Sequence, residues 1–381
     1  MTTLTGSVAP KIITYVRVMR LRTAITLADF VWSDSPEFVE TAQHVVDAER
    51  LGIDTVWSAE AWGTDGVVPL AYLAALTSRI RLATGILQVT ARAVPMTAMT
   101  AMTLDHVSNG RFMLGLGASG PQVVEGLHGQ SYRRPLERLK ESVEVIRLAL
   151  AGETIEYHGN QIELPLPPER GTGFGKALRI GQPPRPHIPI HLATLGPRAL
   201  QFAGAAADGW VGTCFIPEAS AYYLDQLRAG AEAAGRPTSI FDDGDFEIDA
   251  GGPVAFTDDV ERPLRARKNA LAFQLSAMGA PTMNFYHDAY SRIGYAEPAA
   301  RVRELWLAGH RDQAVDAVPD EMALLSSFIG TDGMVRARIR AYRDAGVTDL
   351  RLQPMGKSPT DKLDTLARML DLVREVNEEP V

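Results

Sequence analysis

An acidic and an aromatic side chain follow the second run of residues that has strand character. The run from Ile53 to Ala59 leads directly into Glu60 and Trp62. A carboxylate can donate or accept a proton, and an indole can form the wall of a pocket for a ring. Glu60 and Trp62 are therefore the candidate catalytic residues. A structural interpretation is equally open: Glu60 would pair with an arginine, and Trp62 would pack beneath a loop.

A glycine-rich segment, Gly115 to Gly120 (GLGASG), follows the fourth such run. Its spacing matches the dinucleotide-binding fingerprint. That fingerprint belongs to a first βαβ unit and is followed about 20 residues later by an acidic residue, whereas this chain has Lys140 there. We therefore interpret the segment as a strand end that another group approaches closely. Ser119 does not fit a hydrolase nucleophile either, because its flanking glycines lack the GxSxG spacing.

A candidate anion site follows the fifth run, where Ala193, Thr194, Leu195 and Gly196 lead directly into a helix. Free backbone N–H groups at a helix start attract anions, and a glycine lets a ligand approach the backbone. Every turn from strand to helix has part of this character, so the segment alone is weak evidence.

Metal-binding signals are weak throughout the chain. Acidic residues alternate at positions 243, 245, 247 and 249, but Ile248 and Val254 stand where a calcium loop needs glycine and glutamate, so we expect a solvated acidic turn. His187 and His191 are four residues apart without an acid nearby in sequence, and we expect them to pack rather than to bind a metal. The single cysteine, Cys214, excludes an internal disulfide and fits a reducing compartment such as the cytoplasm.

The elements that must position these residues alternate between strand and helix along the chain. The strand-like runs are 23–30, 53–59, 80–89, 111–117, 188–193, 209–213, a strand within 246–256, and 350–353. Eight strands, each followed by helix, predict a (β/α)8 TIM barrel. The runs are nearly continuous apolar stretches, as in a parallel sheet buried on both faces, and none resembles the polar edge of a doubly wound sheet.

Two long insertions interrupt this pattern, after strands 4 and 7. The first contains a helix over 135–150, a hairpin over 154–164 that turns at Gly159-Asn160, and a stretch rich in Gly, Pro and Arg. The second, over 258–345, is mostly helical. Both leave from the carboxyl ends of strands, where barrel active sites lie, so we expect Arg170 to Arg185 to cover the site.

Bulk properties narrow the classes of protein. A net charge of -8 and a pI near 5.6 argue against a general nucleic-acid binder. No apolar run approaches the roughly 20 residues that cross a bilayer. Residues 1–18 lack the features of a signal peptide. We interpret them as an N-terminal tail, either disordered or the product of an over-long start, before a single barrel domain over 19–381.

From about Leu21 to Val376 the chain resembles the luciferase-like monooxygenase superfamily, and within it the branch of coenzyme F420-dependent oxidoreductases. The matching segments are 84–88 (TGILQ), 92–95, 105–112 (DHVSNGRF) ahead of GLGASG, 190–210, and 341–350 (AYRDAGVTDL). Together, the order and spacing of these segments are specific.

The resemblance implies a flavin-type ring held at the strand ends of a TIM barrel, and a homodimer. It implies a non-prolyl cis peptide at Gly85–Ile86 against the ring, and a cofactor phosphate on the backbone around Thr194 to Gly196. The positions that correspond to cofactor-binding residues are Asp29, Phe30, Glu60, Gly85, Ile86, Gln88, Gly117, Ala118, Ser119, Ala193, Thr194, Leu195, Gly196 and Thr213.

The chain departs from the sugar-phosphate dehydrogenases of this branch at two places. They have a histidine after the strand 2 acid, where this chain has Ala61, and a lysine after strand 6, where it has Thr213 to Ile216. The pocket is therefore expected to be apolar, with side chains such as Phe30, Trp62, Phe215, Phe285 and Tyr286.

These features together predict hydride transfer between F420 and a small or lipophilic carbonyl, alcohol or alkene. Two alternatives stay open. One is an FMN-dependent monooxygenase of the same superfamily, and the other is a non-catalytic flavin-binding relative.

Overall fold

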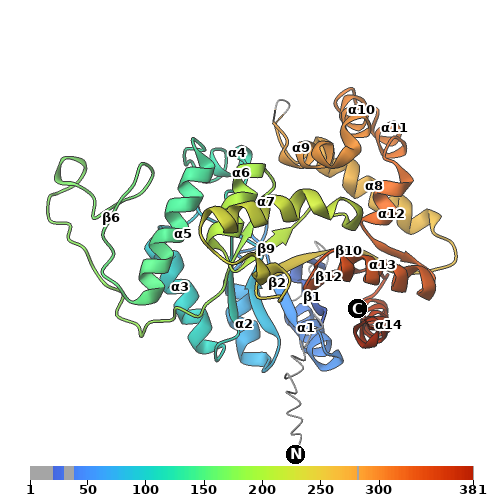
Figure 1. The fold of residues 1–381 in the computed structure, drawn as a ribbon, viewed down its shortest axis with the longest axis horizontal. Helices are drawn as coiled ribbons and strands as arrows, with labels where there is room; N and C mark the ends of the chain where they lie inside the picture. The colour runs from blue at the N-terminus through green and yellow to red at the C-terminus, as the bar shows by residue number, and fades with distance from the viewer. Residues whose placement is uncertain (1–19, 30–37, 281–282, 381) are drawn as a thin grey trace, which may run out of the picture.

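Eight parallel strands close into a barrel in the computed structural model, which describes residues 20–29, 38–280 and 283–380 (Figure 1). The barrel strands, in order around the barrel, are β1 (Arg22–Thr26), β2 (Thr55–Ser58), β3 (Arg81–Thr84), β5 (Phe112–Gly117), β8 (Ile190–Ala193), β9 (Gly209–Gly212), β10 (Glu247–Phe256) and β12 (Asp349–Pro354). Pairing of β12 with β1, in which Arg22 lies opposite Asp349, closes the ring. The predicted TIM barrel is confirmed.

Two short strands depart from the predicted pattern. The run expected over 80–89 is divided at Gly85–Ile86 into β3 and β4 (Leu87–Gln88), and β4 pairs with the end of β5. Within the expected helical stretch, β11 (Phe328–Gly330) adds to β10 outside the ring. The first strand also ends early, because residues 27–29 form a 3-10 turn, η1 (Leu27–Asp29).

Helices cover the outside of the barrel. They are α1 (Phe38–Leu51), α2 (Val68–Leu76), α3 (Val94–Val107), α5 (Pro135–Ala151), α6 (Pro197–Ala206), α7 (Ser220–Ala233), α13 (Asp332–Asp344) and α14 (Pro359–Glu378), with short turns η3 (Pro217–Ala219) and η4 (Thr238–Phe241). The last helix shows how sequence produces them: Ser358 and Asp361 form a reciprocal cap at its start. Leu366, Leu370 and Val373, spaced three or four residues apart, lie on its buried face.

The first insertion contains α4 (Pro121–Val124), α5, the hairpin of β6 (Tyr157–His158) and β7 (Glu163–Leu164), and η2 (Pro168–Arg170). The hairpin is antiparallel, as predicted. Its turn is held against α5 because the carboxylate of Glu141 accepts hydrogen bonds from the backbone N–H groups of residues 160, 161 and 162. The resulting lobe projects to the left in Figure 1.

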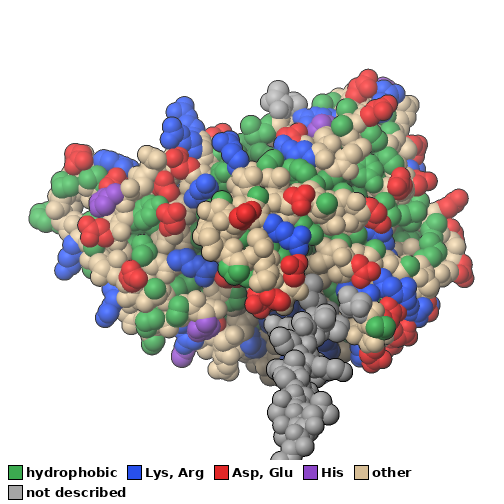
Figure 2. All heavy atoms as spheres, viewed as in Figure 1, with side chains coloured by type: hydrophobic (Ala, Val, Ile, Leu, Met, Phe, Trp, Pro, Cys, Tyr) green, Lys and Arg blue, Asp and Glu red, His purple; other side chains and the backbone are tan. Residues whose placement is uncertain are grey.

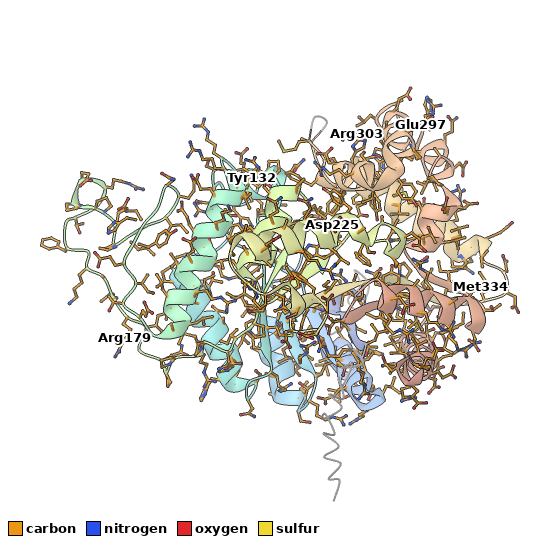
Figure 3. The ribbon with its side chains drawn as sticks, in the orientation of Figure 1. Tyr132, Arg179, Asp225, Glu297, Arg303 and Met334 are labelled. Carbon is orange, nitrogen blue, oxygen red and sulfur yellow. The ribbon has the colours of Figure 1, made fainter. Side chains whose placement is uncertain are left out.

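The expectation that Arg170 to Arg185 covers the strand ends is wrong. Arg185 and His187 contact the buried carboxylate of Asp105, at 2.7 and 3.0 Å. Asp105 lies near the end of α3, just before β5 begins, and His187 lies just before β8, so this contact is on the amino-terminal face of the barrel. Figure 3 shows Arg179 at the lower edge of the lobe, far from Tyr132 at the upper edge.

The second insertion forms a helical unit above β10 and β12. It contains α8 (Glu261–Ser276), α9 (Phe285–Tyr290), η5 (Ser291–Tyr295), α10 (Ala296–Leu307), α11 (Arg311–Asp316) and α12 (Asp320–Leu325). Its apolar core, which includes Leu271, Tyr290 and Val302, is continuous with Cys214 and Ile216 after β9. The insertion therefore packs directly on the loops at the carboxyl ends of the barrel strands.

Charged side chains fill the amino-terminal end of the barrel interior. Arg22 and Arg81 each pair with both Glu247 and Asp349, at 2.6 to 2.9 Å. His191 lies 3.2 Å from Glu247, so it packs in the interior as expected. Burial raises the pKa of Glu247, but His191 and the two arginines outweigh it and lower that pKa to about 2.

The prediction of a solvated acidic turn over positions 243, 245, 247 and 249 is correct for only the first two of these residues. Asp243 and Asp245 are exposed in a turn, as expected, but Glu247 and Asp249 belong to β10 and face the interior.

Across the described ranges, no group of three potential metal ligands lies together, and no helix is long and apolar enough to cross a membrane. On the face shown in Figure 2, acidic and basic side chains are interspersed. Residues 1–18, predicted to be a tail, lie outside the described ranges.

Candidate active site at the carboxyl ends of the strands

The end of β3 is shaped by close backbone packing. The peptide bond Gly85–Ile86 is cis, as the resemblance implied. Gly85 N–H donates to Ser58 O at 2.7 Å, and Thr84 Oγ1 both donates to Gly115 O and accepts from Gly115 N. A Cβ on Gly115 would lie 1.8 Å from the carbonyl oxygen of Thr84. The interpretation of GLGASG as a strand end approached closely by another group is confirmed, and that group is the backbone of β3.

Ile86 lies across the end of the neighbouring strand. A Cβ on Gly117 would lie only 3.0 Å from Ile86 Cδ1. Ile86, Ala118 and Ser119 are all partly exposed. Ser119 adopts a left-handed conformation with φ of 58°, and its carbonyl oxygen accepts a hydrogen bond from the hydroxyl of Tyr132 at 2.8 Å. The ends of β3 and β5 thus present an apolar surface bordered by backbone polar groups.

Glu60 is held at the rim by an arginine. Its side chain is 9% exposed, and both carboxylate oxygens accept from Arg92 Nη1, at 2.7 and 2.8 Å. Gln88 N–H donates to the same carboxylate at 3.1 Å. Arg92 also binds Asp65, which accepts hydrogen bonds from the first N–H groups of α2. The hydrogen bonds from Arg92 to Glu60 are the main reason that the pKa of Arg92 is raised. The arginine partner required by the structural interpretation is therefore present.

The other candidates near Glu60 differ in exposure. Trp62 is 65% exposed, so it does not pack beneath a loop. Gln88 is buried, and its amide contacts the carbonyl oxygens of Glu60 and Ala61, at 3.3 and 3.4 Å. The Oε1 atom of Gln88 is buried without a hydrogen-bond partner among the described residues. Phe30 lies outside the described ranges, and Asp29 is the last residue of η1.

The predicted anion site lies at the end of β8. Thr194 is buried, its carbonyl oxygen accepts from the indole of Trp210 at 2.9 Å, and its Oγ1 has no partner within the described chain. Gly196 is the N-cap of α6, and a Cβ built on it would meet nothing within 4 Å. Leu195 packs against the helical insertion, and Thr213 is exposed after β9. An open helix start and an unpartnered hydroxyl thus occur together here.

A buried ion pair on the other side of the barrel was missed from the sequence. Arg351 on β12 reaches across to Gly212 O at 3.2 Å, and its Nε lies 3.2 Å from Asp249 Oδ1. Asp249 also accepts from the indole of Trp57 at 3.0 Å. Burial raises the pKa of Asp249 to about 6, despite the charge of Arg351. The only signal was the alternation of polar and apolar residues over 349–353, which indicates a strand with one polar face.

The two insertions meet above the barrel. The rings of Tyr132 and Phe285 lie 6.4 Å apart between centroids. The candidate residues follow the ends of six adjacent strands: Asp29 comes after β1, Thr213 comes after β9, and the others follow β2, β3, β5 and β8. The structure therefore brings the described candidates to one end of the barrel, along one arc of its rim.

Comparison with known proteins gives matches over most of the chain. A family model described as luciferase-like monooxygenase matches residues 19–349. A Mycobacterium tuberculosis protein, Rv3520c, provisionally named a coenzyme F420-dependent oxidoreductase, is 40% identical over 309 residues, which cover 81% of this chain and 88% of that protein. A 5,10-methylenetetrahydromethanopterin reductase of Methanolobus tindarius is 29% identical, over 84% of this chain and 91% of its own length.

A solved structure has the same fold. The coenzyme F420-dependent tetrahydromethanopterin reductase of Methanopyrus kandleri superposes with a TM-score of 0.69 at 22% sequence identity. The match covers 91% of this chain and 97% of the reductase. At this level of identity the likeness concerns the barrel and its insertions alone.

Proposed function

This chain belongs to the luciferase-like monooxygenase family, and we propose that it is a coenzyme F420-dependent oxidoreductase. It would transfer a hydride between the deazaflavin and a small or lipophilic organic substrate. The 40% identical relative with a provisional F420-dependent name supports the choice of cofactor.

The observation that carries the proposal is the combination of an apolar strand-end surface with an anion site on the same rim. A deazaflavin coenzyme has a flat ring and an anionic phosphate tail. The partly exposed Ile86 surface suits one face of the ring. The hydroxyl of Thr194, which has no partner among the described residues, and the open start of α6 at Gly196 suit a phosphate. The residues therefore fit the cofactor.

Each part of the rim has a proposed task. When bound, the deazaflavin supplies the hydride-transfer chemistry. Ile86, with Gly117 beneath it, supports the ring, while Ala118 and Ser119 border it. Thr194 to Gly196 and Thr213 hold the phosphate.

Glu60 and Trp62 are proposed to lie beside the reacting substrate. Arg92 and Gln88 fix the carboxylate of Glu60 in one orientation. The exposed indole of Trp62 can close over a bound ring and exclude water.

The test is a pair of fluorescence titrations of the purified protein, with F420 and with FMN. We expect saturable binding of F420 and turnover with at least one compound from a panel of ketones, aldehydes, alcohols and alkenes. Binding of FMN alone, with oxygen consumption, would establish the monooxygenase alternative instead. Binding of F420 without turnover across the panel would establish a non-catalytic relative.

We also propose that the enzyme is a homodimer in the cytoplasm. Val68, Tyr72 and Leu76 form an exposed apolar row along α2, and Met96, Met99 and Val107 are exposed on α3. These helices could supply the roughly 800 Å² per partner of a typical interface. Light scattering after gel filtration should give twice the chain mass, and Leu76→Asp should give the monomer. A monomeric wild type would refute the dimer.

A further inference from the structure

A second set of polar groups lies across the barrel mouth from the proposed ring surface at Ile86. The wall that carries them consists of the ends of β10 and β12 and the insertion that follows β10. In the closed order of strands, β10 lies opposite β3, and β12 lies opposite β5. Side chains from β12, and from the insertion that follows β10, therefore face the Ile86 surface across the mouth of the barrel. A substrate held between the ring and that wall would contact these side chains.

Arg351 of β12 is a charged group on this wall. Its guanidinium reaches the last residue of β9, where Nη2 donates to Gly212 O, so it lies at the carboxyl-end level of the barrel. Its Nε faces Asp249. The side chain is 13% exposed, and no acceptor for Nη1 occurs in the described part of the chain. One edge of a fixed guanidinium is thus available to a ligand.

Tyr286 comes from the helical insertion, whose apolar core includes Cys214, two residues after the Gly212 carbonyl that accepts from this guanidinium. Its position at the start of α9 is fixed because the buried Asn284 accepts hydrogen bonds from the N–H groups of Tyr286 and His287, both at 2.9 Å. The ring packs against the apolar cluster that contains Cys214. Burial raises the pKa of Tyr286 to about 12, with a partial lowering by Arg351, so at neutral pH its hydroxyl is a hydrogen-bond donor.

We propose that Arg351 and Tyr286 together bind the oxygen atom of a carbonyl substrate. This inference rests on the proposed function and narrows its substrate class to ketones and aldehydes. A guanidinium N–H and a phenol O–H are both donors, so they suit one acceptor oxygen and not an alkene. Carboxylates, which present the same kind of oxygen, should bind as unreactive analogues.

The chemical step balances with these groups. The carbonyl carbon gains the hydride from the reduced deazaflavin, which is thereby oxidised, and a C–H bond forms as the C=O π bond breaks. The electron pair moves to the oxygen, where the charge of Arg351 stabilises it. The oxygen then takes the proton of Tyr286, giving the alcohol, and the tyrosinate regains a proton from water.

The test measures binding of benzoate, a carboxylate probe, by calorimetry in the presence of saturating F420. We expect Tyr286→Phe and Arg351→Lys each to weaken benzoate binding about tenfold, because each removes a hydrogen bond to a charged group. Lysine keeps a positive charge near Asp249, which limits the structural damage. The matched control is Tyr295→Phe, because Tyr295 is a half-buried tyrosine of the same insertion that lies near Glu218 and Arg338. It should bind benzoate like the wild type.

Coenzyme binding separates failure of this inference from failure of the proposed function. F420 affinity should stay within about twofold of wild type in both variants, since these residues lie opposite the ring surface. Equal benzoate binding in wild type, Tyr286→Phe and Arg351→Lys would overturn the inference, as would absence of benzoate binding to a protein that binds F420. A large loss of F420 affinity in Tyr286→Phe would assign the residue to the coenzyme instead. If the wild type does not bind F420, the proposed function fails, and benzoate titration of the protein alone still tests the oxygen site.

Discussion

Replacement of Asp249 by asparagine should change how stability depends on pH. Asp249 is 1% exposed inside the barrel, between the indole of Trp57 and the guanidinium of Arg351. Burial raises its pKa from 3.8 to about 6. Asparagine has the same shape and still accepts from the indole, but it carries no charge to be desolvated.

The direction of the effect follows from proton binding. Well below pH 3.8 the carboxyl is protonated in both the folded and the unfolded chain, so its ionisation costs the folded state nothing. As the pH rises, the unfolded chain releases this proton first, and the folded state loses stability until the pH passes about 6. A difference of about 2 pKa units corresponds to about 3 kcal/mol. About 2 kcal/mol of this should appear between pH 4.5 and 7.5.

The assay is denaturant unfolding of wild type and Asp249→Asn at four pH values over that range. Taking the difference between the two proteins cancels the titration of groups that they share. The free energy of unfolding of Asp249→Asn should increase relative to wild type as the pH rises. Asp243→Asn, in the exposed turn before β10, is the control and should follow the wild-type curve. A difference that stays constant with pH, or shrinks as the pH rises, would refute the reasoning.

Three further substitutions test other parts of the rim. Gly115→Ala should cost about 3 kcal/mol or more, or prevent folding, because the new methyl meets the Thr84 carbonyl oxygen; a normal melting temperature would contradict this packing. Thr194→Val should change the free energy of unfolding by less than about 0.5 kcal/mol, since the hydroxyl has no partner within the described chain. The same substitution should weaken F420 binding about tenfold. Unchanged F420 affinity in the titration would remove Thr194 from the phosphate site. Arg92→Gln should destabilise the protein by about 2 kcal/mol, because Glu60 loses its partner in a nearly buried position; denaturant unfolding that matches wild type would show that the pair contributes nothing.

Local patterns predicted the outer surface of the barrel better than its interior. The strand runs and amphipathic helices are periodic over short stretches, so the number of units and both insertions could be predicted. The interior charges could not. Glu247 pairs with Arg22 and Arg81, which come from strands far away in the sequence. Along the chain Glu247 follows two exposed aspartates, so it looked like part of the same solvated turn.

The rim was predicted in position but only partly in its contacts. Gly85–Ile86 could be identified by resemblance because the local sequence matches the family pattern. From the sequence, Glu60 could be interpreted either as a catalytic acid or as the partner of an arginine. Its partner, Arg92, lies 32 positions away, and either side chain could have faced solvent. The prediction that the segment from Arg170 to Arg185 covers the site failed for a similar reason. Nothing local to Arg185 shows that Asp105, on the opposite face from the mouth, is its partner.

The position of β12 in the ring has a consequence for synthesis on the ribosome. This strand pairs with β10 on one side and β1 on the other, so it is inserted between the first and seventh strands. Leu21, just before β1, also exchanges two hydrogen bonds with Asn377 of α14. Until these late residues emerge, β1 and β10 each have an unpaired edge, and such edges can pair with other chains. A nascent chain that stalls before residue 349 should therefore need chaperone protection, whereas one released after α14 can close the ring by itself.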